Sequence, residues 1–382
     1  ECKAEGALTI LAGPQADVDY LGEHKWREHP FRFKGLAKNF NFSIHGPAEQ
    51  ANYLLQHLDD GVWKDTPGLL YVSKNNNIIQ NPKKKWEEKY LRKVDWKNIY
   101  RIGNTGLVTH TITIGQVLQQ LGCPYAARNK WVKIDYPLSI EGLDTQKVTL
   151  SLKGCSFCDV AADKGFYGQL DSAAVMEQIS CLPETADGRK IPFELINENP
   201  IPGLLRLLRH TKDSNIMLSQ INLILRADWF LRGESNLRRA LERAQSLGMR
   251  ILLSSVGFES FDDRILRNLN KGLNVETNLQ AIRLMRQLKE EFPLVWGYAR
   301  SEGAIHGFIH PTPWDTEASS VHTQRVISMH NLPFDILPEH SIPLIIHHAS
   351  GLGYWIREVE QREEMQFKRY GSIIGWWHEE RP

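Results

Sequence analysis

The sequence predicts an α/β protein built on a parallel sheet that is either open or barrel-like. Strand-like runs and helical patterns alternate from residue 148 onward, as they do in chains of β-α units. Polar or glycine-containing segments follow several of these runs, at the strand ends where parallel sheets carry their ligand sites. Weaker strand and helix signals before residue 83 predict a second, partial α/β domain.

The N-terminal part contains two similar strand-and-turn designs. ALTILAGP (7–14) and FNFSIHGP (40–47) are short apolar runs that end in Gly-Pro. Apolar residues at helical spacing follow over 48–61, and a glycine ends that pattern. GLLYVSKNNNIIQNP (68–82) predicts a hairpin that turns at its asparagines. We therefore expect a partial α/β domain over 1–82.

Residues 83–145 differ in character and predict a linker. KKKWEEKYLRKVDWKNIY is basic and aromatic, and a solvated amphipathic segment explains it better than a nucleic-acid patch. LGCPYAARNKWVKIDYP (121–137) is expected to form a loop that leads into the next domain.

Residues 146–332 predict the larger domain, a (β/α) barrel-like unit, and 333–382 a C-terminal extension. The expected strands are 148–152, 192–197, 221–227, 250–260 and material within 294–311, with one more at 342–348. The expected helices lie near 172–182, 201–211, 235–247, 261–270 and 275–290, and one begins at Asp315.

The composition excludes several classes of protein. The chain has 382 residues, 42% hydrophobic and 24% charged, with a net charge of +1, which is ordinary for a soluble domain and disfavours a nucleic-acid partner. No apolar run is long enough for a membrane helix, so no membrane span is expected. The start, ECKAEGALTILAGP, does not resemble a signal peptide and predicts a chain that begins inside a domain, as a fragment would.

Five cysteines are too few for a disulfide scaffold of this length and favour a reducing cytoplasm. Two of them form Cys155-x-x-Cys158 in KGCSFCDVA, directly after the strand-like KVTLSL. In a reducing compartment this spacing indicates a metal site or a redox pair. A thioredoxin-like pair would need a βαβ unit before it, which the sequence does not show.

One stretch has a specific resemblance. SVGFESFDDRILRNLNKGLNVETNLQAIRLMRQL (255–288) resembles the fourth strand and following helices of radical S-adenosylmethionine (SAM) enzymes. KGCSFCDVA resembles their cluster loop after the first strand, NLILRADW their strand ending in Arg-Ala-Asp, and GAIHGFIHPTPWDT a later strand and turn. The resemblance covers about 148–330 and implies a partial TIM barrel.

A second resemblance lies in the N-terminal part. LAGPQA, FSIHGPAEQANYLLQHLDDG and TPGLLYVSKNNNIIQNP are similar to the later half of a Rossmann-like cobalamin-binding domain. This implies that Gly13, Pro14 and Gly46 line the corrin or its tail, since small residues allow close backbone approach. The first half of such a domain is absent, so no axial histidine is assigned.

The family motif CxxxCxxC holds a [4Fe–4S] cluster through three thiolates and leaves one iron open for SAM. The resemblance implies that Cys155 and Cys158 hold iron, but the position four residues before Cys155 is Ser151. Three explanations stay open. In the first, Cys123 of GCPY is the third ligand. In the second, a non-cysteine group such as Ser151 or Asp159 is the third ligand. In the third, the protein has lost the cluster.

The resemblance also implies the SAM contacts. Glu259 would accept from the SAM ammonium group, with a helix-capping carboxylate as the plainer interpretation. Arg226 and Asp228 would lie near the ribose or carboxylate, unless they form a surface ion pair. Asn197 is a further candidate at a strand end, unless it only makes a turn before Pro200.

Histidines give weaker signals. His306 and His310 share one face of an extended strand, but a structural role is the more common one for such residues. The same holds for His347 and His348 at the end of an apolar run.

We therefore expect a cobalamin-dependent radical SAM enzyme that forms a 5′-deoxyadenosyl radical, methylates an unactivated carbon and resides in the cytoplasm. A reductant such as flavodoxin or ferredoxin would be its partner, and its substrate is a small molecule, peptide or lipid that the sequence does not name. The alternatives are a non-catalytic cobalamin- or ligand-binding protein without the cluster, and a zinc- or disulfide-stabilised barrel.

Overall fold

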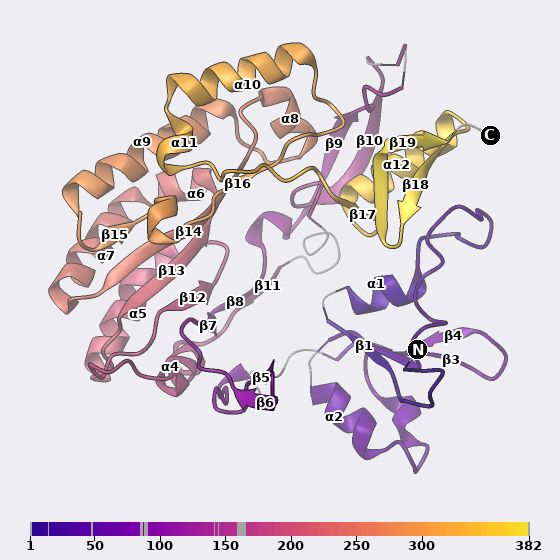
Figure 1. Ribbon diagram of the computed structural model, residues 1–382, viewed down its shortest axis with the longest axis horizontal. Coiled ribbons are helices and arrows are strands. Elements are labelled where there is room, and N and C mark those ends of the chain that lie inside the picture. The colour runs from indigo at the N-terminus through magenta and orange to yellow at the C-terminus, as the bar shows by residue number, and fades with distance from the viewer. Residues whose placement is uncertain are drawn as a thin grey trace. The chain divides into compact units, whose positions relative to one another are not determined.

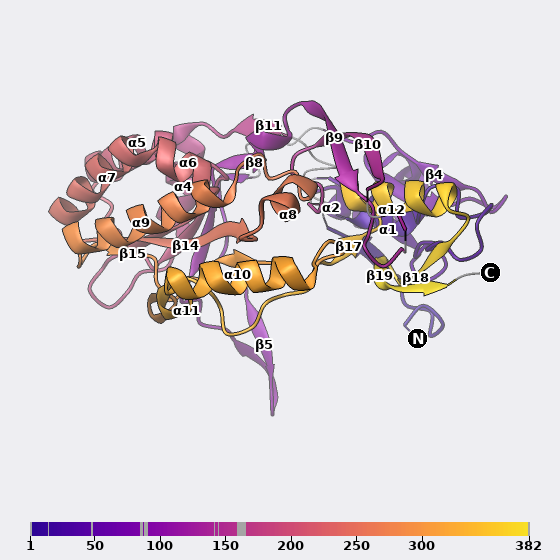
Figure 2. The same cartoon turned by 90° about the horizontal axis from the view of Figure 1, so that it is seen from above.

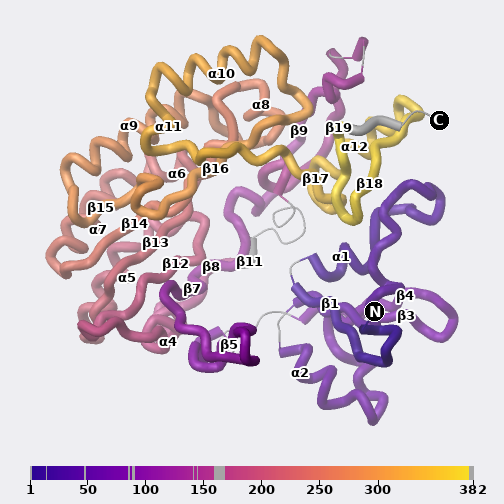
Figure 3. Tube along the Cα trace, in the orientation of Figure 1, coloured from indigo at the N-terminus to yellow at the C-terminus, as the bar shows by residue number. Residues whose placement is uncertain are grey.

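The computed structural model describes residues 2–13, 15–46, 49–84, 87, 91–140, 142–143, 145–158 and 166–380, with the backbone alone for 166–167 and 378–380. The chain forms two compact units, and each draws on more than one segment. Unit 1 contains residues 1–90, 128–165 and 345–382, and unit 2 contains 91–127 and 166–344. The trace in Figure 3 therefore passes between the units four times.

Unit 2 is built on a parallel sheet in the order β15-β14-β13-β12-β7, with β16 also paired to β14. The strands follow one another across the sheet in chain order, which is the arrangement of an open barrel. Their bounds are β7 Gly115–Leu118, β12 Phe193–Ile196, β13 Gln220–Leu225, β14 Arg250–Glu259, β15 Trp296–Gly297 and β16 Gly307–Phe308.

Helices connect these strands as predicted, and Figure 2 shows α5, α7 and α9 along the same side of β14. Asp262 and Asn274 cap their helices, because each side chain accepts hydrogen bonds from backbone N–H groups of the first turn. The helices are α4 Ser172–Cys181, α5 Ile201–Asp213, α6 Ala227–Arg232, α7 Glu234–Leu247, α8 Asp263–Asn268, α9 Val275–Glu291, α10 Glu317–Met329 and α11 Leu332–Asp335.

The main hydrophobic core lies between the sheet and these helices. Phe230 and Trp296 are fully buried and stack with ring centroids 6.0 Å apart. The Trp296 indole donates to the Met285 carbonyl at 3.1 Å, so its one polar atom is satisfied. Burying each such side chain stabilises the fold by roughly 1.5–3 kcal/mol.

The segment predicted as a linker contributes several strands to unit 2. It supplies β7, the hairpin β5 Tyr100–Gly103 and β6 Gly106–Thr109, and β8 Gln120–Gly122, which pairs with β11 Phe166–Gln169. The prediction of a loop over 121–137 is wrong, because most of these residues belong to β8, to the 3-10 turn Pro124–Ala126 and to β9 Asn129–Asp135.

Unit 1 contains the predicted N-terminal strands as a four-stranded sheet. The first two strands pair in parallel and the others antiparallel, so the hairpin at 68–82 is confirmed. The elements are β1 Ile10–Ala12, α1 Ala16–Leu21, β2 Phe42–Ile44, α2 Glu49–Gln56, the 3-10 turn Val62–Asp65, β3 Leu69–Val72 and β4 Ile78–Gln80.

Two further pieces complete unit 1. The antiparallel pair of β9 and β10 Lys147–Lys153 packs on α12 Gly351–Arg362, and a small sheet contains β17 Ile346–His347, β18 Gln366–Tyr370 and β19 Ile373–Glu380. KVTLSL is therefore a strand, but it is not the first strand of the parallel sheet. Exposed and buried side chains alternate along β10, which is typical of an antiparallel strand with one face toward solvent.

The predicted division into 1–82, 83–145, 146–332 and 333–382 stays a prediction, since a compact unit can join parts of several domains. Among the described residues, no helix is long and apolar enough to cross a membrane.

Candidate ligand site at the carboxyl edge of the parallel sheet

Three predicted residues lie at the carboxyl ends of adjacent parallel strands. Asn197 follows β12, Arg226 follows β13, and Glu259 ends β14. Parallel neighbours end at the same edge, so these residues share one edge of the sheet (Figure 1). Their exposed fractions are 6%, 6% and 8%, which is unusually low for polar side chains.

Glu259 has a strained backbone and a close-fitting carboxylate. Its φ of 62° lies in the left-handed region, which a residue with a side chain rarely adopts. A Cβ on Gly257 would lie 2.3 Å from its Oε1, and one on Gly307 would lie 3.0 Å from its Oε2. Two glycines therefore make room for this carboxylate, and strain of this kind is concentrated at functional sites.

Lys271 completes the site and was missed by the sequence analysis. Its Nζ donates to Glu259 Oε1 at 3.2 Å, and the lysine is 4% exposed. Asn278 supports the strand end, because its amide donates to the carbonyls of Phe258 and Ser260 at 3.0 and 3.1 Å. The position of Lys271 in the Asn-Lys-Gly stretch was a signal that could have indicated it.

Arg226 is fixed by stacking and by hydrogen bonds. Its guanidinium lies 4.0 Å from the centroid of the Tyr125 ring, and it donates to the Lys271 carbonyl. The Tyr125 hydroxyl in turn donates to the Asn270 carbonyl at 2.9 Å. Asp228 accepts from Arg226 Nε at 3.0 Å, so the structure places its carboxylate on the guanidinium.

Asn197 is held by its neighbours in the same way. Its amide donates to Gln119 Oε1 at 2.7 Å, and its own Oδ1 accepts from the Asn199 N–H at 2.8 Å, as the predicted turn requires. Glu198 is accessible to solvent, but the protein atoms around its carboxyl desolvate it and raise its pKa, and the charges of Lys271 and Arg226 oppose that rise. We call Asn197, Arg226, Glu259 and Lys271 the edge site.

The cysteine candidates fall into different units. Cys123 belongs to unit 2, two residues before Tyr125. Cys155 and Cys158 belong to unit 1, in a turn where the Cys158 N–H donates to the Cys155 carbonyl at 3.2 Å. Ser151 is exposed on β10, opposite Trp131. Asp159 lies outside the described residues.

This donor set fits an iron–sulfur cluster only in part. The turn in unit 1 supplies two thiolates, whereas the resemblance implies three. The metal assignments of Cys155, Cys158, Cys123 and Ser151 stay predictions, and we derive no chemical step through a cluster.

The candidate cobalamin residues lie at one edge of the other sheet. β1 and β2 pair in parallel with Ala12 opposite Ile44, so Gly13 and Gly46 follow adjacent strand ends. Both glycines have positive φ, 127° and 131°, and no described atom lies within 4 Å of a Cβ placed on either. Pro14 lies outside the described residues.

The histidine pair of unit 2 does not converge on a ligand. His306 is 1% exposed, its Nε2 lies 2.7 Å from the Tyr298 carbonyl, and its Nδ1 accepts from the Val256 N–H at 3.1 Å. The structural interpretation of His306 is therefore confirmed. His310 stacks on Phe308 instead.

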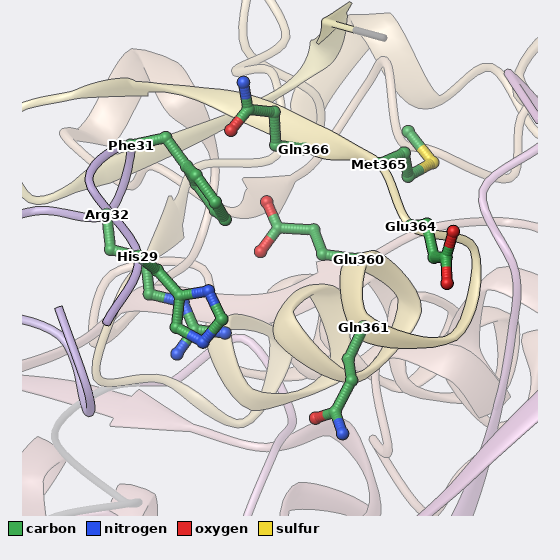
Figure 4. Close-up of a pocket in the computed structure, with 8 residues that line it drawn as sticks. All are labelled: His29, Phe31, Arg32, Glu360, Gln361, Glu364, Met365 and Gln366. Carbon is green, nitrogen blue, oxygen red and sulfur yellow. The ribbon is translucent and has the colours of Figure 1, made fainter. Parts of the chain in front are cut away.

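A cavity of about 350 Å³ lies elsewhere in unit 1, and the predictions did not include it. Figure 4 shows the side chains of Phe31 and Glu360, two of the residues that line it, directed toward each other. The Glu360 carboxylate accepts hydrogen bonds from the Phe367 N–H at 2.8 Å and from Arg369 at 2.9 Å. Its charge is therefore paired with Arg369 within the protein.

Comparisons with known proteins give one kind of match. No family model and no curated protein sequence matches the chain. Solved structures do match, among them three of the cobalamin-dependent S-adenosylmethionine radical enzyme OxsB. The form with aqua-cobalamin and S-adenosylmethionine bound has a TM-score of 0.57 at 10% identity, the form with aqua-cobalamin 0.56 at 11%, and the apo, selenomethionine-labelled form 0.55 at 12%.

The matches cover 97–98% of this chain but 52% of OxsB, so the chain spans about half the length of the enzyme it matches. At this identity the similarity concerns the fold. The mixed α/β architecture with a parallel sheet is thereby confirmed, and the chain has the fold of part of a cobalamin-dependent radical SAM enzyme.

Proposed function

We propose that the chain is a cobalamin-dependent radical SAM protein that binds the amino-acid end of SAM at the edge site. The observation that carries this proposal is the buried Glu259 carboxylate, seated against Gly257 and Gly307 and paired with Lys271. A zwitterionic ligand needs one carboxylate for its ammonium group and cations for its own carboxylate. Glu259 supplies the first, and Arg226 and Lys271 supply the second.

Each residue would have one role in binding. Glu259 would accept hydrogen bonds from the ligand ammonium, which would replace the donor that Lys271 now provides. Arg226 would donate to the ligand carboxylate or ribose, and Asp228 and Tyr125 would hold the guanidinium in place. Asn197 would add a neutral donor or acceptor.

The remaining chemistry belongs to the cofactors. A bound cluster and SAM would supply radical chemistry at an unactivated carbon, and methylation would be the reaction if cobalamin binds near Gly13 and Gly46. A one-electron donor such as flavodoxin or ferredoxin would then be required. The cytoplasm, where thiols stay reduced, suits this chemistry.

A second candidate function rests on the cysteines. The turn at Cys155 and Cys158 offers two thiolates, whereas the cluster of the resembled family needs three. The alternative is therefore a protein that binds SAM or cobalamin without a cluster. The two functions differ in iron content and in radical formation.

The test is anaerobic iron–sulfur reconstitution followed by SAM titration. We expect about four irons per chain, as one [4Fe–4S] cluster requires, and an EPR spectrum that SAM perturbs. Cys123→Ala should lose the cluster if Cys123 is the third ligand. Cys181→Ala, at the end of α4, is the matched control. Iron-free protein that still binds SAM would establish the second candidate.

The edge site is tested by affinity. Glu259→Gln should weaken SAM binding by about 10-fold or more, the value of one charge-assisted hydrogen bond. Arg226→Lys should also weaken binding while keeping the positive charge. Glu276→Gln, on the exposed face of α9, is the control and should bind normally. Unchanged affinity in folded Glu259→Gln would refute the assignment.

A further inference from the structure

Two adjacent histidines and an aspartate from the opposite end of the chain meet in unit 1. His347 ends β17, His348 follows it, and Asp19 lies on α1. Asp19 Oδ1 lies 2.9 Å from His347 Nε2 and 3.0 Å from His348 Nε2. All three ligand atoms lie within 4.8 Å of one another, and no other such group of histidine, cysteine or carboxylate atoms occurs among the described residues.

The backbone around the histidines is firmly held. The His347 carbonyl accepts from both the N–H and the hydroxyl of Ser350, which caps α12, and the His348 N–H donates to the Ser372 carbonyl at 2.9 Å. A Cβ on Gly353 would lie 2.4 Å from the His348 carbonyl oxygen, so the first turn of α12 packs directly against this segment. The two imidazoles therefore have little freedom to separate.

The separations between the ligand atoms suit a metal ion. Two ligand atoms at metal distances of 2.0–2.2 Å lie about 3.0 Å apart when they subtend 90°, and about 3.4 Å apart at the tetrahedral angle. The Asp19–His347 and Asp19–His348 separations of 2.9 and 3.0 Å match the right-angled arrangement, and the two Nε2 atoms lie within 4.8 Å of each other. Two imidazoles and one carboxylate on adjacent octahedral positions form a set that binds divalent iron and its first-row neighbours with open positions left over.

We propose that Asp19, His347 and His348 bind a divalent first-row transition metal ion. Access to it comes from a cavity of about 480 Å³ that His348 lines together with Ala349, Tyr354 and Arg357. His348 itself is 3% exposed, so the cavity is the route by which water or a small ligand reaches the ion. This site lies in unit 1 and is independent of the function proposed for the edge site.

Metal binding through Nε2 changes the tautomer of both rings, because the ring proton must then lie on Nδ1. Nδ1 of His347 now accepts a hydrogen bond from the Ala349 N–H at 3.2 Å, and that bond is lost on metal binding. His347 is therefore the weakest of the three ligands, and His348 and Asp19 contribute more.

The competing explanation is a metal-free cluster in which Asp19 accepts hydrogen bonds from both rings. Asp19→Asn separates the two explanations. Its amide oxygen still accepts both bonds and preserves the fold, but a neutral amide is a poor ligand for a transition metal. His57→Ala is the matched control, because His57 and Asp60 form an exposed pair at 2.7 Å.

The experiment uses the full chain with Cys155→Ser and Cys158→Ser, which removes the two thiolates of the competing candidate metal site. Chelator-treated protein is dialysed against Co(II) or Zn(II), bound metal is counted, and the Co(II) absorption is recorded. We expect one ion per chain and a spectrum without a sulfur-to-metal charge-transfer band. Asp19→Asn and His348→Ala should lower affinity at least about 100-fold, and His347→Ala should lower it less.

The control variant His57→Ala should bind one ion as the parent does. Circular dichroism and thermal melting of each metal-free variant establish that it is folded. The proposal is overturned if the parent binds no stoichiometric metal, or if folded Asp19→Asn binds it as tightly as the parent. Because SAM binding is not measured here, either result leaves the edge-site proposal unaffected.

Discussion

The carboxylate of Glu259 has the space that two glycine residues leave for it. Gly257 lies two residues earlier on the same strand, and Gly307 lies on β16, which pairs with β14. Neither has a side chain to push the carboxylate away from Lys271. The resemblance in the sequence identified Glu259 and Arg226, but it did not identify Lys271, whose role depends on how the turn between α8 and α9 folds back.

Gly257→Ala is predicted to disturb the edge site directly. The new methyl group would lie 2.3 Å from Glu259 Oε1 and 3.1 Å from Lys271 Nζ, so the ion pair must shift. We expect SAM affinity to fall about 10-fold or more, the value of one charged hydrogen bond. Calorimetric titration measures it. Wild-type affinity in a folded variant would mean that the carboxylate position is unimportant.

At the scale of secondary structure, the periodicity of apolar residues predicted where helices and strands lie better than it predicted which strands pair. The strands at 193–196, 220–225 and 250–259 and the helices after them were predicted because their apolar runs and helical patterns are long. Residues 147–153 were correctly predicted as a strand, but its pairing depends on distant residues. β7 was missed because its four residues, GQVL, are too short to show a period.

Gly203 in α5 gives a prediction of increased stability, whereas Gly257→Ala is predicted to be harmful. Gly203 has no positive φ, and a Cβ there would meet Gln119 Nε2 at an ordinary 3.7 Å. Gly203→Ala should therefore stabilise the protein by about 0.5–1 kcal/mol, because alanine loses less backbone freedom on folding. Differential scanning calorimetry should show a higher Tm.

Gly248→Ala is the matched comparison, because Gly248 ends α7 with φ 61°. That variant should lower the Tm, since alanine is strained in the left-handed region. A lower Tm for Gly203→Ala would contradict the prediction and indicate that Gln119 cannot give way.

At the scale of the whole molecule, unit 1 is joined by a buried ion network between its first and last segments. Glu23 has no exposed side-chain surface, and it accepts from Arg369 Nε at 2.9 Å and Arg357 Nη1 at 3.3 Å. Its carboxylate also accepts from the Phe33 N–H at 3.0 Å. Burial opposes ionisation, but the bonds and charge of Arg369, with the Phe33 N–H and Arg357, lower the pKa of Glu23 to about 2.

This pKa predicts acid sensitivity. The ordinary value is 4.5, so the stabilisation is fully present above about pH 5 and is lost as the pH falls toward 2. The shift corresponds to about 3 kcal/mol, on the order of 1.4 kcal/mol per unit. The charged or titratable groups that face Glu23 are Arg369, Arg357, Arg32, Glu360 and His348.

Urea unfolding at pH 7 and pH 3 measures this effect. Glu23→Gln should be less stable than wild type at pH 7 by about 3–5 kcal/mol, because it leaves buried arginine charges without their partner. It should also lose less stability than wild type between the two pH values. Glu28→Gln, at an exposed carboxylate, is the control. Equal acid losses in wild type and Glu23→Gln would contradict the assignment.

The distance along the chain between Glu23 and Arg369 has a consequence during synthesis. These partners are 346 residues apart. At roughly 5–20 residues per second, a ribosome needs about 20–70 s to make the second after the first. During that interval the nascent N-terminal segment cannot complete its own ion pairs, whereas much of unit 2 can fold. Unit 2 is therefore expected to fold first, and unit 1 is expected to be completed last.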